Sequence, residues 1–154
     1  MKLVVFSDSH RSLRGMRDAV ELEQPDYVLH LGDLEEDATL LAQEYPTLAV
    51  ASVPGNCDFN FASPLLKLLT YGGVRILMSH GHIWHVKSGY DAAIAAARTR
   101  SVQLLLFGHT HVPYCAQQED GLWVVNPGSI RDHGNYAVVS FADGSIADIQ
   151  LKRI

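Results

Sequence analysis

The stretch LVVFSDSH, residues 3–10, joins a short apolar run directly to an aspartate and a histidine. Leu3 to Phe6 is rich in β-branched residues and apolar at every position, which is typical of a strand buried on both faces. Asp8 and His10 follow at once, two residues apart. In open α/β sheets, functional groups gather at the carboxyl ends of the strands. This stretch therefore predicts a buried strand that ends in a functional site.

Five further apolar runs end in the same way. They cover residues 27–31, 48–53, 74–78, 104–107 and 122–125. The clusters that follow them are Gly32-Asp33, Pro54-Gly55-Asn56-Cys57-Asp58, Ser79-His80-Gly81-His82, Gly108-His109-Thr110-His111 and Asn126-Pro127-Gly128-Ser129. Because the carboxyl ends of neighbouring parallel strands meet at one edge of a sheet, we expect these polar clusters to lie close together.

The segments between the runs predict the remaining architecture. Helices are expected over residues 13–23, capped by Ser12, over 35–44, stopped by Pro46, and over 87–100. Alternation of strand and helix in the first half predicts parallel strands. Hairpins are expected for residues 65–78, with Gly72 and Gly73 in the turn, for 112–125 and for 136–151. Two sheets packed face to face with helices outside would satisfy this pattern, with residues 1–154 forming one domain.

Bulk properties exclude several classes of protein. The 154 residues are 47% hydrophobic and 19% charged, as in an ordinary globular domain. The net charge of −5, with no cluster of lysine and arginine, argues against specific nucleic-acid binding. No apolar run approaches 18 residues, and the first residues form a strand pattern rather than a signal peptide. Cys57 and Cys115 imply no disulfide framework, which favours a reducing compartment, the cytoplasm.

Seven potential metal donors follow the predicted strands. They are Asp8, His10, Asp33, Asn56, His80, His109 and His111. Each alone has a simpler explanation, such as a hydrogen-bonded loop residue or a turn cap. Together, imidazole, carboxylate and amide donors without thiolates suit manganese, iron or zinc. Seven donors exceed the four of a closed zinc site, so they suggest two ions. The pairs Asp8/His10 and His109/His111 would project to one face of an extended segment.

The order of these motifs resembles that of a known superfamily. D-x-H, G-D, G-N-x-D, H-G-H and G-H-T-H, spread over residues 3 to 130, resemble the calcineurin-like metallophosphoesterases. The short chain and the segment Asn126 to Ser129 resemble its small YfcE-type phosphodiesterase branch. The resemblance implies a four-layer α/β/β/α sandwich. It also implies that Asp33 bridges two metals, one completed by Asp8, His10 and His111, the other by Asn56, His80 and His109.

The function implied is hydrolysis of a phosphoester by a hydroxide that bridges two divalent ions. A diester is expected, with a phosphomonoesterase or nucleotide phosphatase as the alternative. Manganese is the expected metal, with iron, zinc and nickel as alternatives. A third reading is a non-catalytic scaffold like the retromer subunit of this fold, although that subunit lacks ligand histidines that this chain keeps. The partner expected is a small phosphorylated substrate, and exposed strand edges with the Phe59–Phe61 loop suggest a dimer or tetramer.

Three further residues are expected to act at the site. Cys57 stands where many members of the superfamily carry a histidine that is assigned to orient substrate or to protonate the leaving oxygen. Cys57 is either a substrate-side group or a small packing residue. Asp58 is expected to orient a neighbour or to cap the loop. His82 faces substrate or supports its loop. Whether Cys57 or His82 protonates the leaving group stays open. Arg11 is either a phosphate contact or a solvated side chain.

Overall fold

The structure of the chain is a computed structural model, and it describes residues 1–59 and 62–154. Its strands are β1 (Lys2–Phe6), β2 (Tyr27–His30), β3 (Ala49–Ser52), β4 (Leu66–Tyr71), β5 (Val74–Ser79), β6 (Leu104–Leu106), β7 (Tyr114–Gln117), β8 (Trp123–Asn126), β9 (Asn135–Ala142) and β10 (Ser145–Arg153). Its α-helices are α1 (Leu13–Glu23), α2 (Glu35–Glu44), α3 (Asp91–Thr99) and α4 (Ile130–His133), and its 3₁₀ helices are η1 (His82–Trp84) and η2 (Val86–Ser88).

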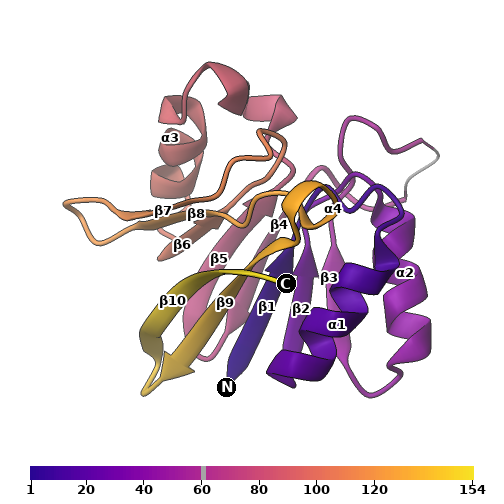
Figure 1. The fold of residues 1–154 in the computed structure, drawn as a ribbon. Helices are drawn as coiled ribbons and strands as arrows, with labels where there is room; N and C mark the ends of the chain where they lie inside the picture. The colour runs from indigo at the N-terminus through magenta and orange to yellow at the C-terminus, as the bar shows by residue number, and fades with distance from the viewer. Residues whose placement is uncertain (60–61) are drawn as a thin grey trace.

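Two five-stranded sheets form the centre of the molecule. The first has the order β10-β9-β1-β2-β3, with β1, β2 and β3 parallel and β9 antiparallel to β1. The second has the order β4-β5-β6-β8-β7, with β5, β6 and β8 parallel. Helices α1 and α2 lie outside the first sheet, and α3 lies outside the second (Figure 1). The predicted α/β sandwich of two mixed sheets between helices is therefore confirmed.

Three apolar clusters explain why the strands are apolar on both faces. The inner cluster fills the space between the sheets, with Val5, Leu29, Ile76 and Val139 among its members. The other face of the first sheet packs on α1 and α2, and that of the second packs on α3. Burial of alternate residues on opposite faces of each strand thus removes both sets of side chains from water, which favours this layered arrangement.

Helical segments differ from expectation in three places. The helix predicted over 87–100 begins only at Asp91, because η2 occupies residues 86–88 and Gly89 then adopts a φ of 139° that no α-helix contains. Ser12 precedes α1 as predicted, but its side chain makes no capping hydrogen bond. The four-residue α4 was not predicted; its Ser129 cap accepts a hydrogen bond from the Asp132 amide.

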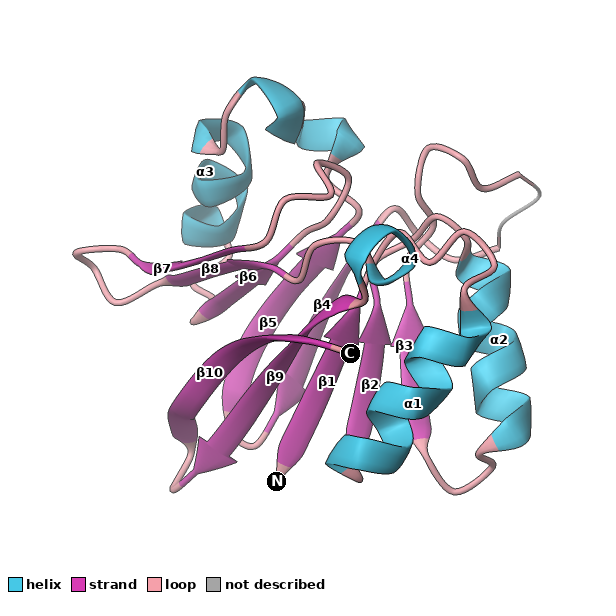
Figure 2. Ribbon diagram, viewed as in Figure 1, coloured by secondary structure: helices cyan, strands magenta, loops and turns pink. Residues whose placement is uncertain are grey.

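The loops after the first three strands lie at one end of the first sheet (Figure 2). In Figure 2 the loops after β1, β2 and β3 gather at the same end of the molecule as α4. Phe59 there is 85% exposed, whereas Phe61, predicted to share its loop, lies outside the described residues. In residues 1–59 and 62–154, no helix is both long and apolar enough to cross a membrane.

A buried carboxylate ties α1 to strands β1, β9 and β10 of the first sheet. Glu23 is only 5% exposed, and its Oε1 accepts hydrogen bonds from Lys152 Nζ at 2.6 Å and the Tyr136 hydroxyl at 3.0 Å. Lys2 Nζ lies 3.4 Å from Oε2. Burial alone would raise the pKa of Glu23, but these partners bring it below the usual 4.5. Its pairing therefore stabilises the fold above that pH and is lost as the pH falls through the lowered value.

Glu23→Gln is expected to lower the free energy of unfolding by about 1–2 kcal/mol at pH 7, since the lysine partners are partly solvated. The gap between the wild type and the variant should shrink as the pH falls below 4.5. Urea unfolding at pH 7 and at pH 3.5 measures both values. Glu21→Gln, which changes an exposed carboxylate on the same helix, is the control. A gap that stays constant with pH would contradict the role assigned to the Glu23 charge.

Candidate metal centre

Asp8 is the most buried carboxylate of the predicted donor set, with no exposed surface. Its Oδ2 accepts hydrogen bonds from the Ser7 hydroxyl at 2.6 Å and the His109 amide at 3.0 Å. Its Oδ1 accepts no hydrogen bond from any residue that the structure describes. A buried oxygen in this condition is costly, so its position calls for an explanation.

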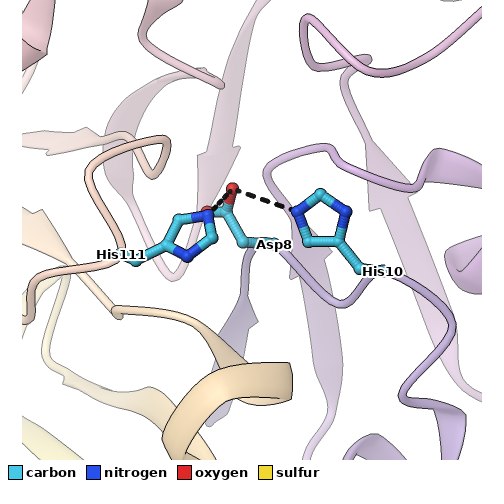
Figure 3. Close-up of side chains that lie close together, drawn as sticks. All are labelled: Asp8, His10 and His111. Atoms are coloured by element: carbon cyan, nitrogen blue, oxygen red, sulfur yellow. Dashed lines mark ion pairs between the residues drawn. The ribbon is translucent and has the colours of Figure 1, made fainter.

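Three imidazoles converge on this oxygen. His111 Nε2 lies 3.0 Å from Asp8 Oδ1, His80 Nε2 lies 3.8 Å away and His10 Nε2 lies 4.0 Å away. Figure 3 shows His10 and His111 on either side of Asp8, each with a ring nitrogen toward the same carboxylate oxygen. Asp8, His10 and His111 form one group whose donor atoms all lie within 4.8 Å of one another. These are the three residues expected to complete the first metal site.

A second group joins Asp8 to Asp33 and His80. Asp33 Oδ2 lies 3.4 Å from His80 Nε2 and 3.8 Å from His10 Nε2, so it faces one histidine of each group. Its Oδ1 accepts a hydrogen bond from the Cys57 amide at 2.8 Å. His80 Nδ1 lies 2.7 Å from the Leu31 carbonyl oxygen, which directs its Nε2 toward the two carboxylates. Both Asp8 and Asp33 thus reach donors of two neighbouring groups.

The other two predicted donors lie at the margin of these groups. His109 Nδ1 is 3.1 Å from His80 Nε2, so His109 contacts the second group through another histidine. Asn56 is exposed, and its amide nitrogen lies 3.6 Å from the Cys57 sulfur. The structure therefore brings His10, His80 and His111 together around the carboxylates of Asp8 and Asp33. His109 lies beside them, and Asn56 lies on the adjacent loop.

Backbone conformation differs from the extended geometry expected for the paired donors. β1 ends at Phe6 and β6 ends at Leu106, before the donors begin. Positive φ angles are found instead at Asp8 (53°), His10 (40°), Asp33 (50°), His109 (67°) and His111 (62°). The prediction that strand alternation aligns each pair was wrong; left-handed turns aim these side chains. Such turns cost of order 1–3 kcal/mol for a residue other than glycine, and they concentrate at functional sites.

Gly55 lets the two loops beneath the site approach each other. A Cβ atom at this position would lie 2.1 Å from Asp33 Oδ1, the oxygen that accepts the Cys57 amide. No side chain fits in that space, because carbon and oxygen would overlap well inside their contact distance. The glycine in the G-N-x-D motif is thus required for the position of the Asp33 carboxylate rather than for its own φ angle.

The charges of the site fit a divalent cation. Burial alone would raise the pKa of Asp33, but His80 and the Cys57 amide hold it well below its usual range. Burial alone would lower the pKa of His80, yet Asp33 and Asp8 raise it. Burial and the neighbouring His80 lower the pKa of His109 to about 4, so its imidazole is neutral, the form that binds metal. The carboxylates therefore favour positive charge beside the unpaired oxygen of Asp8, and the surrounding nitrogen and oxygen donors suit such an ion.

Cys57 and Asp58 occupy different parts of the same loop. The Cys57 residue is exposed, but its thiol is partly shielded from water by neighbouring atoms. This partial desolvation and the nearby Asp33 carboxylate raise the pKa of the thiol, so it stays protonated at neutral pH. The Asp58 carboxylate accepts hydrogen bonds from the amides of Gly55 at 2.7 Å, Glu35 at 2.8 Å and Asp33 at 3.0 Å. Asp58 therefore caps its own loop through the Gly55 amide and orients the neighbouring loop through the amides of Asp33 and Glu35.

The remaining predicted residue, His82, opens η1 beside the second group. Its ring centre lies 5.6 Å from that of His80 and 6.2 Å from that of His109. Burial and the neighbouring His80 lower its pKa, and its Nδ1 is buried without a hydrogen-bond partner in the described parts of the chain. His82 thus borders the donor set as a neutral imidazole.

One supporting residue, Asp37, was not predicted from sequence. Buried Asp37 accepts hydrogen bonds from the Ser9 hydroxyl at 2.6 Å and the Arg11 amide at 2.7 Å, which fixes the loop after β1. Asn126 also supports the loop of His109, because its amide nitrogen donates to the Gly108 carbonyl at 3.0 Å. Asp37 stands in a helix that carries no motif, so no signal in the sequence pointed to it.

Comparison with known proteins places this geometry in a family. Residues 1–148 match the calcineurin-like phosphoesterase superfamily domain. The chain belongs to this superfamily. It is 34% identical over 137 residues to the probable metallophosphoesterase YsnB of Bacillus subtilis, a match that covers 85% of this chain and 76% of YsnB. The family resemblance carried by the ordered motifs is therefore confirmed.

Solved structures share the fold of this chain. A predicted phosphoesterase from Streptococcus pneumoniae superposes with a TM-score of 0.82 at 24% identity, over 97% of this chain and 87% of the other. The phosphoesterase YfcE of E. coli gives 0.65 at 20% identity, over 97% and 98%. Vps29 of Entamoeba histolytica, solved with zinc, gives 0.75 at 24% identity, over 100% and 98%.

Proposed function

We propose that this metallophosphoesterase hydrolyses a phosphodiester with the help of two divalent metal ions. The observation that supports this most directly is the buried Asp8 Oδ1, on which His10, His80 and His111 converge without making a hydrogen bond. A pair of ions would supply positive charge for the phosphoryl group and would lower the pKa of an attacking water toward neutrality. Manganese is the metal we propose, with iron, zinc or nickel as alternatives.

The donors divide between the two ions as follows. Asp8, His10 and His111 would hold one ion, His80, His109 and Asn56 would hold the other, and Asp33 would be shared. Asp33 suits that role because its Oδ2 faces His10 at 3.8 Å and His80 at 3.4 Å. Two ions outweigh the charges of Asp8 and Asp33, so the site would attract a phosphate although the chain carries −5.

A cavity beside the donors favours a diester over a monoester. It has a volume of about 560 Å³ and is lined by Arg11, Glu35, Cys57 and Phe59, among others. Cys57 also donates its amide to Asp33, so the cavity and the donor set share a wall. A phosphodiester carries a second ester group that can fill such a space, whereas a monoester carries none beyond its single leaving group. Binding of that second group would lower KM for diesters.

Hydrolysis of matched substrates tests the proposal. The purified protein with added Mn²⁺ is offered bis(p-nitrophenyl) phosphate and p-nitrophenyl phosphate, and p-nitrophenol release is followed. We expect kcat/KM for the diester to exceed that for the monoester by about tenfold, the value of roughly 1.4 kcal/mol of extra binding. Faster monoester turnover would show that the chain is a phosphomonoesterase, and elemental analysis that finds no bound metal would exclude the mechanism.

A non-catalytic scaffold is the second candidate, and the likeness to Vps29 is the observation that favours it. This chain nevertheless keeps every donor of the predicted set, and five of them, two carboxylates and three imidazoles, lie together. A scaffold has no need of such a set, because each left-handed turn that carries a donor costs stability. Absence of turnover of either phosphoester by fully metal-loaded protein would favour the scaffold.

Cys57→Ser should leave the metal content unchanged and alter turnover only, because we place the Cys57 thiol on the substrate side of the loop. A hydroxyl is a stronger hydrogen-bond donor than a thiol, so kcat should change by no more than about tenfold in either direction. Elemental analysis and diester kinetics of the variant measure the two effects. Loss of one ion would instead make Cys57 a ligand. Cys115→Ser, in the half-buried strand β7, is the matched control.

His82 and Asp58 complete the proposed site. The neutral His82 imidazole borders His80 and His109, which suits a hydrogen bond to substrate, and Asp58 holds the loops of Asp33 and Cys57. We further propose that residues 1–154 act as one domain in the cytoplasm on a small phosphorylated substrate, without nucleic-acid or membrane partners. A dimer or tetramer through exposed strand edges is the assembly we expect.

A further inference from the structure

The imidazole of His111 is held between two carboxylates, and the second belongs to a residue that no sequence motif marked. His111 Nε2 lies 3.0 Å from Asp8 Oδ1, and His111 Nδ1 lies 2.5 Å from Asp132 Oδ2. Asp132 lies in α4, at the end of the molecule where the loops after the first three strands gather (Figure 2). The two nitrogens of one ring therefore have different partners, one inside the donor set and one outside it.

We infer that Asp132 is a positioning residue for the metal centre. Its carboxylate accepts a hydrogen bond from His111 Nδ1 and so keeps the proton on that nitrogen, which leaves the lone pair of Nε2 directed toward Asp8. Carboxylates that accept from the second nitrogen of a histidine commonly fix the tautomer and the ring orientation of a metal ligand. The inference rests on the proposed function, since it assumes that His111 binds an ion.

Asp132 is itself fixed by a short chain of hydrogen bonds that returns to Asp8. The Asp132 amide donates to Ser129 Oγ at 3.0 Å, and the Ser129 hydroxyl donates to the Asp8 carbonyl at 2.9 Å. Ser129 has no exposed surface. The Asp8 backbone is thus tied to Ser129, the cap of α4, and the His111 imidazole is tied to Asp132 within α4. These hydrogen bonds set the distance between the Asp8 and His111 donors.

His80 shows the same principle with a different partner. Its Nδ1 lies 2.7 Å from the Leu31 carbonyl oxygen, and both residues are fully buried. The Asp132–His111 contact is more open, with the side chains 37% and 35% exposed. Water can replace a lost partner more easily there, so we expect removal of Asp132 to weaken one metal site by about tenfold, the low end of the effect of such outer partners.

Binding of Mn²⁺ alone provides the first test. Free Mn²⁺ is measured by electron paramagnetic resonance during titration of the wild type, Asp132→Ala and Asp132→Asn. We expect one of two binding classes to weaken by about tenfold in Asp132→Ala and to recover partly in Asp132→Asn, whose amide oxygen still accepts a hydrogen bond. The Mn²⁺ affinity of the other class should stay within about threefold of the wild-type value, because its ligands do not contact Asp132.

Asp120→Ala is the matched control for this titration. It removes another half-exposed carboxylate, which accepts from Arg98 Nε at 2.9 Å on an exposed ion pair outside the donor set. We expect it to bind Mn²⁺ as the wild type does. Melting temperatures of all variants are recorded, because Asp132 also contributes its backbone amide to the Ser129 cap, and a substitution that loosens α4 would lower them.

The tautomer of His111 supplies a readout that a purely structural role would not move. In zinc-loaded protein with ¹⁵N-labelled histidine, we expect a downfield proton on His111 Nδ1 in the wild type. That signal should be lost or broadened by solvent exchange in Asp132→Ala and retained in Asp120→Ala. His111→Gln, which removes the ring, assigns the signal.

Two results would overturn the inference. One is unchanged Mn²⁺ binding in Asp132→Ala with the Nδ1 proton still protected. The other is equal weakening of both classes together with a fall in melting temperature, which would show a general loss of structure. A wild type that binds neither Mn²⁺ nor Zn²⁺ would overturn the proposed metal centre itself, so the two failures are distinguishable.

Discussion

Asp33→Asn is expected to abolish tight binding of both metal ions and to lower phosphodiester turnover by about 1000-fold or more, roughly 4 kcal/mol of transition-state stabilisation. The reason is its position: Asp33 Oδ2 faces His10 of one group and His80 of the other. An amide has the same shape but carries no charge, and one of its two ends repels a cation. Elemental analysis after desalting and initial rates with bis(p-nitrophenyl) phosphate measure the two effects.

Asp143→Asn provides an unusually close control for this change. Asp143 is exposed in the turn between β9 and β10, and its φ of 53° nearly equals the 50° of Asp33. The same substitution in the same left-handed backbone conformation therefore separates loss of charge at the site from any change in backbone preference. If Asp33→Asn retained two tightly bound ions while Asp143→Asn behaved as the wild type, Asp33 would not be the shared ligand.

Gly108→Ala should strongly destabilise the protein although it adds a single carbon. A Cβ there would lie 1.9 Å from Ser7 Oγ and 2.7 Å from Ser7 Cβ, and Ser7 is completely buried. The Ser7 hydroxyl holds Asp8 Oδ2, so relief of the clash must displace Asp8 from its donors. We expect a loss of roughly 3 kcal/mol, the upper range of overpacking, and a fall of roughly 6–12 °C in melting temperature.

Thermal unfolding and Mn²⁺ binding of Gly108→Ala measure the predicted damage. Gly121→Ala is the comparison, because a Cβ there meets nothing within 4 Å and the φ of +92° leaves only backbone strain. That strain should cost about 1–2 kcal/mol without loss of metal. The steric argument would fail if Gly108→Ala melted no lower than Gly121→Ala and kept both ions.

Most of the fold could be predicted because the central strands are apolar at every position, which indicates burial on both faces. Residues 3–6 and 104–106 are apolar at every position, and the structure buries them between a helical layer and a second sheet. Helix boundaries were less predictable. The alanine-rich segment before Arg100 favours helix throughout, but Gly89 and the 3₁₀ turn at Val86 to Ser88 delay its start to Asp91.

The sequence by itself determined which residues stand at the ends of the strands, since apolar runs and the motifs that follow them are local features. Only the tertiary structure decided how those residues meet. Left-handed turns, rather than strand alternation, aim Asp8, His10 and His111 at one point. Ser129 reaches the Asp8 carbonyl across 121 positions of the chain, and through it Asp132 reaches His111. Hydrogen bonds between such distant residues depend on how the two sheets and α4 pack, and no pattern of neighbouring residues encodes them.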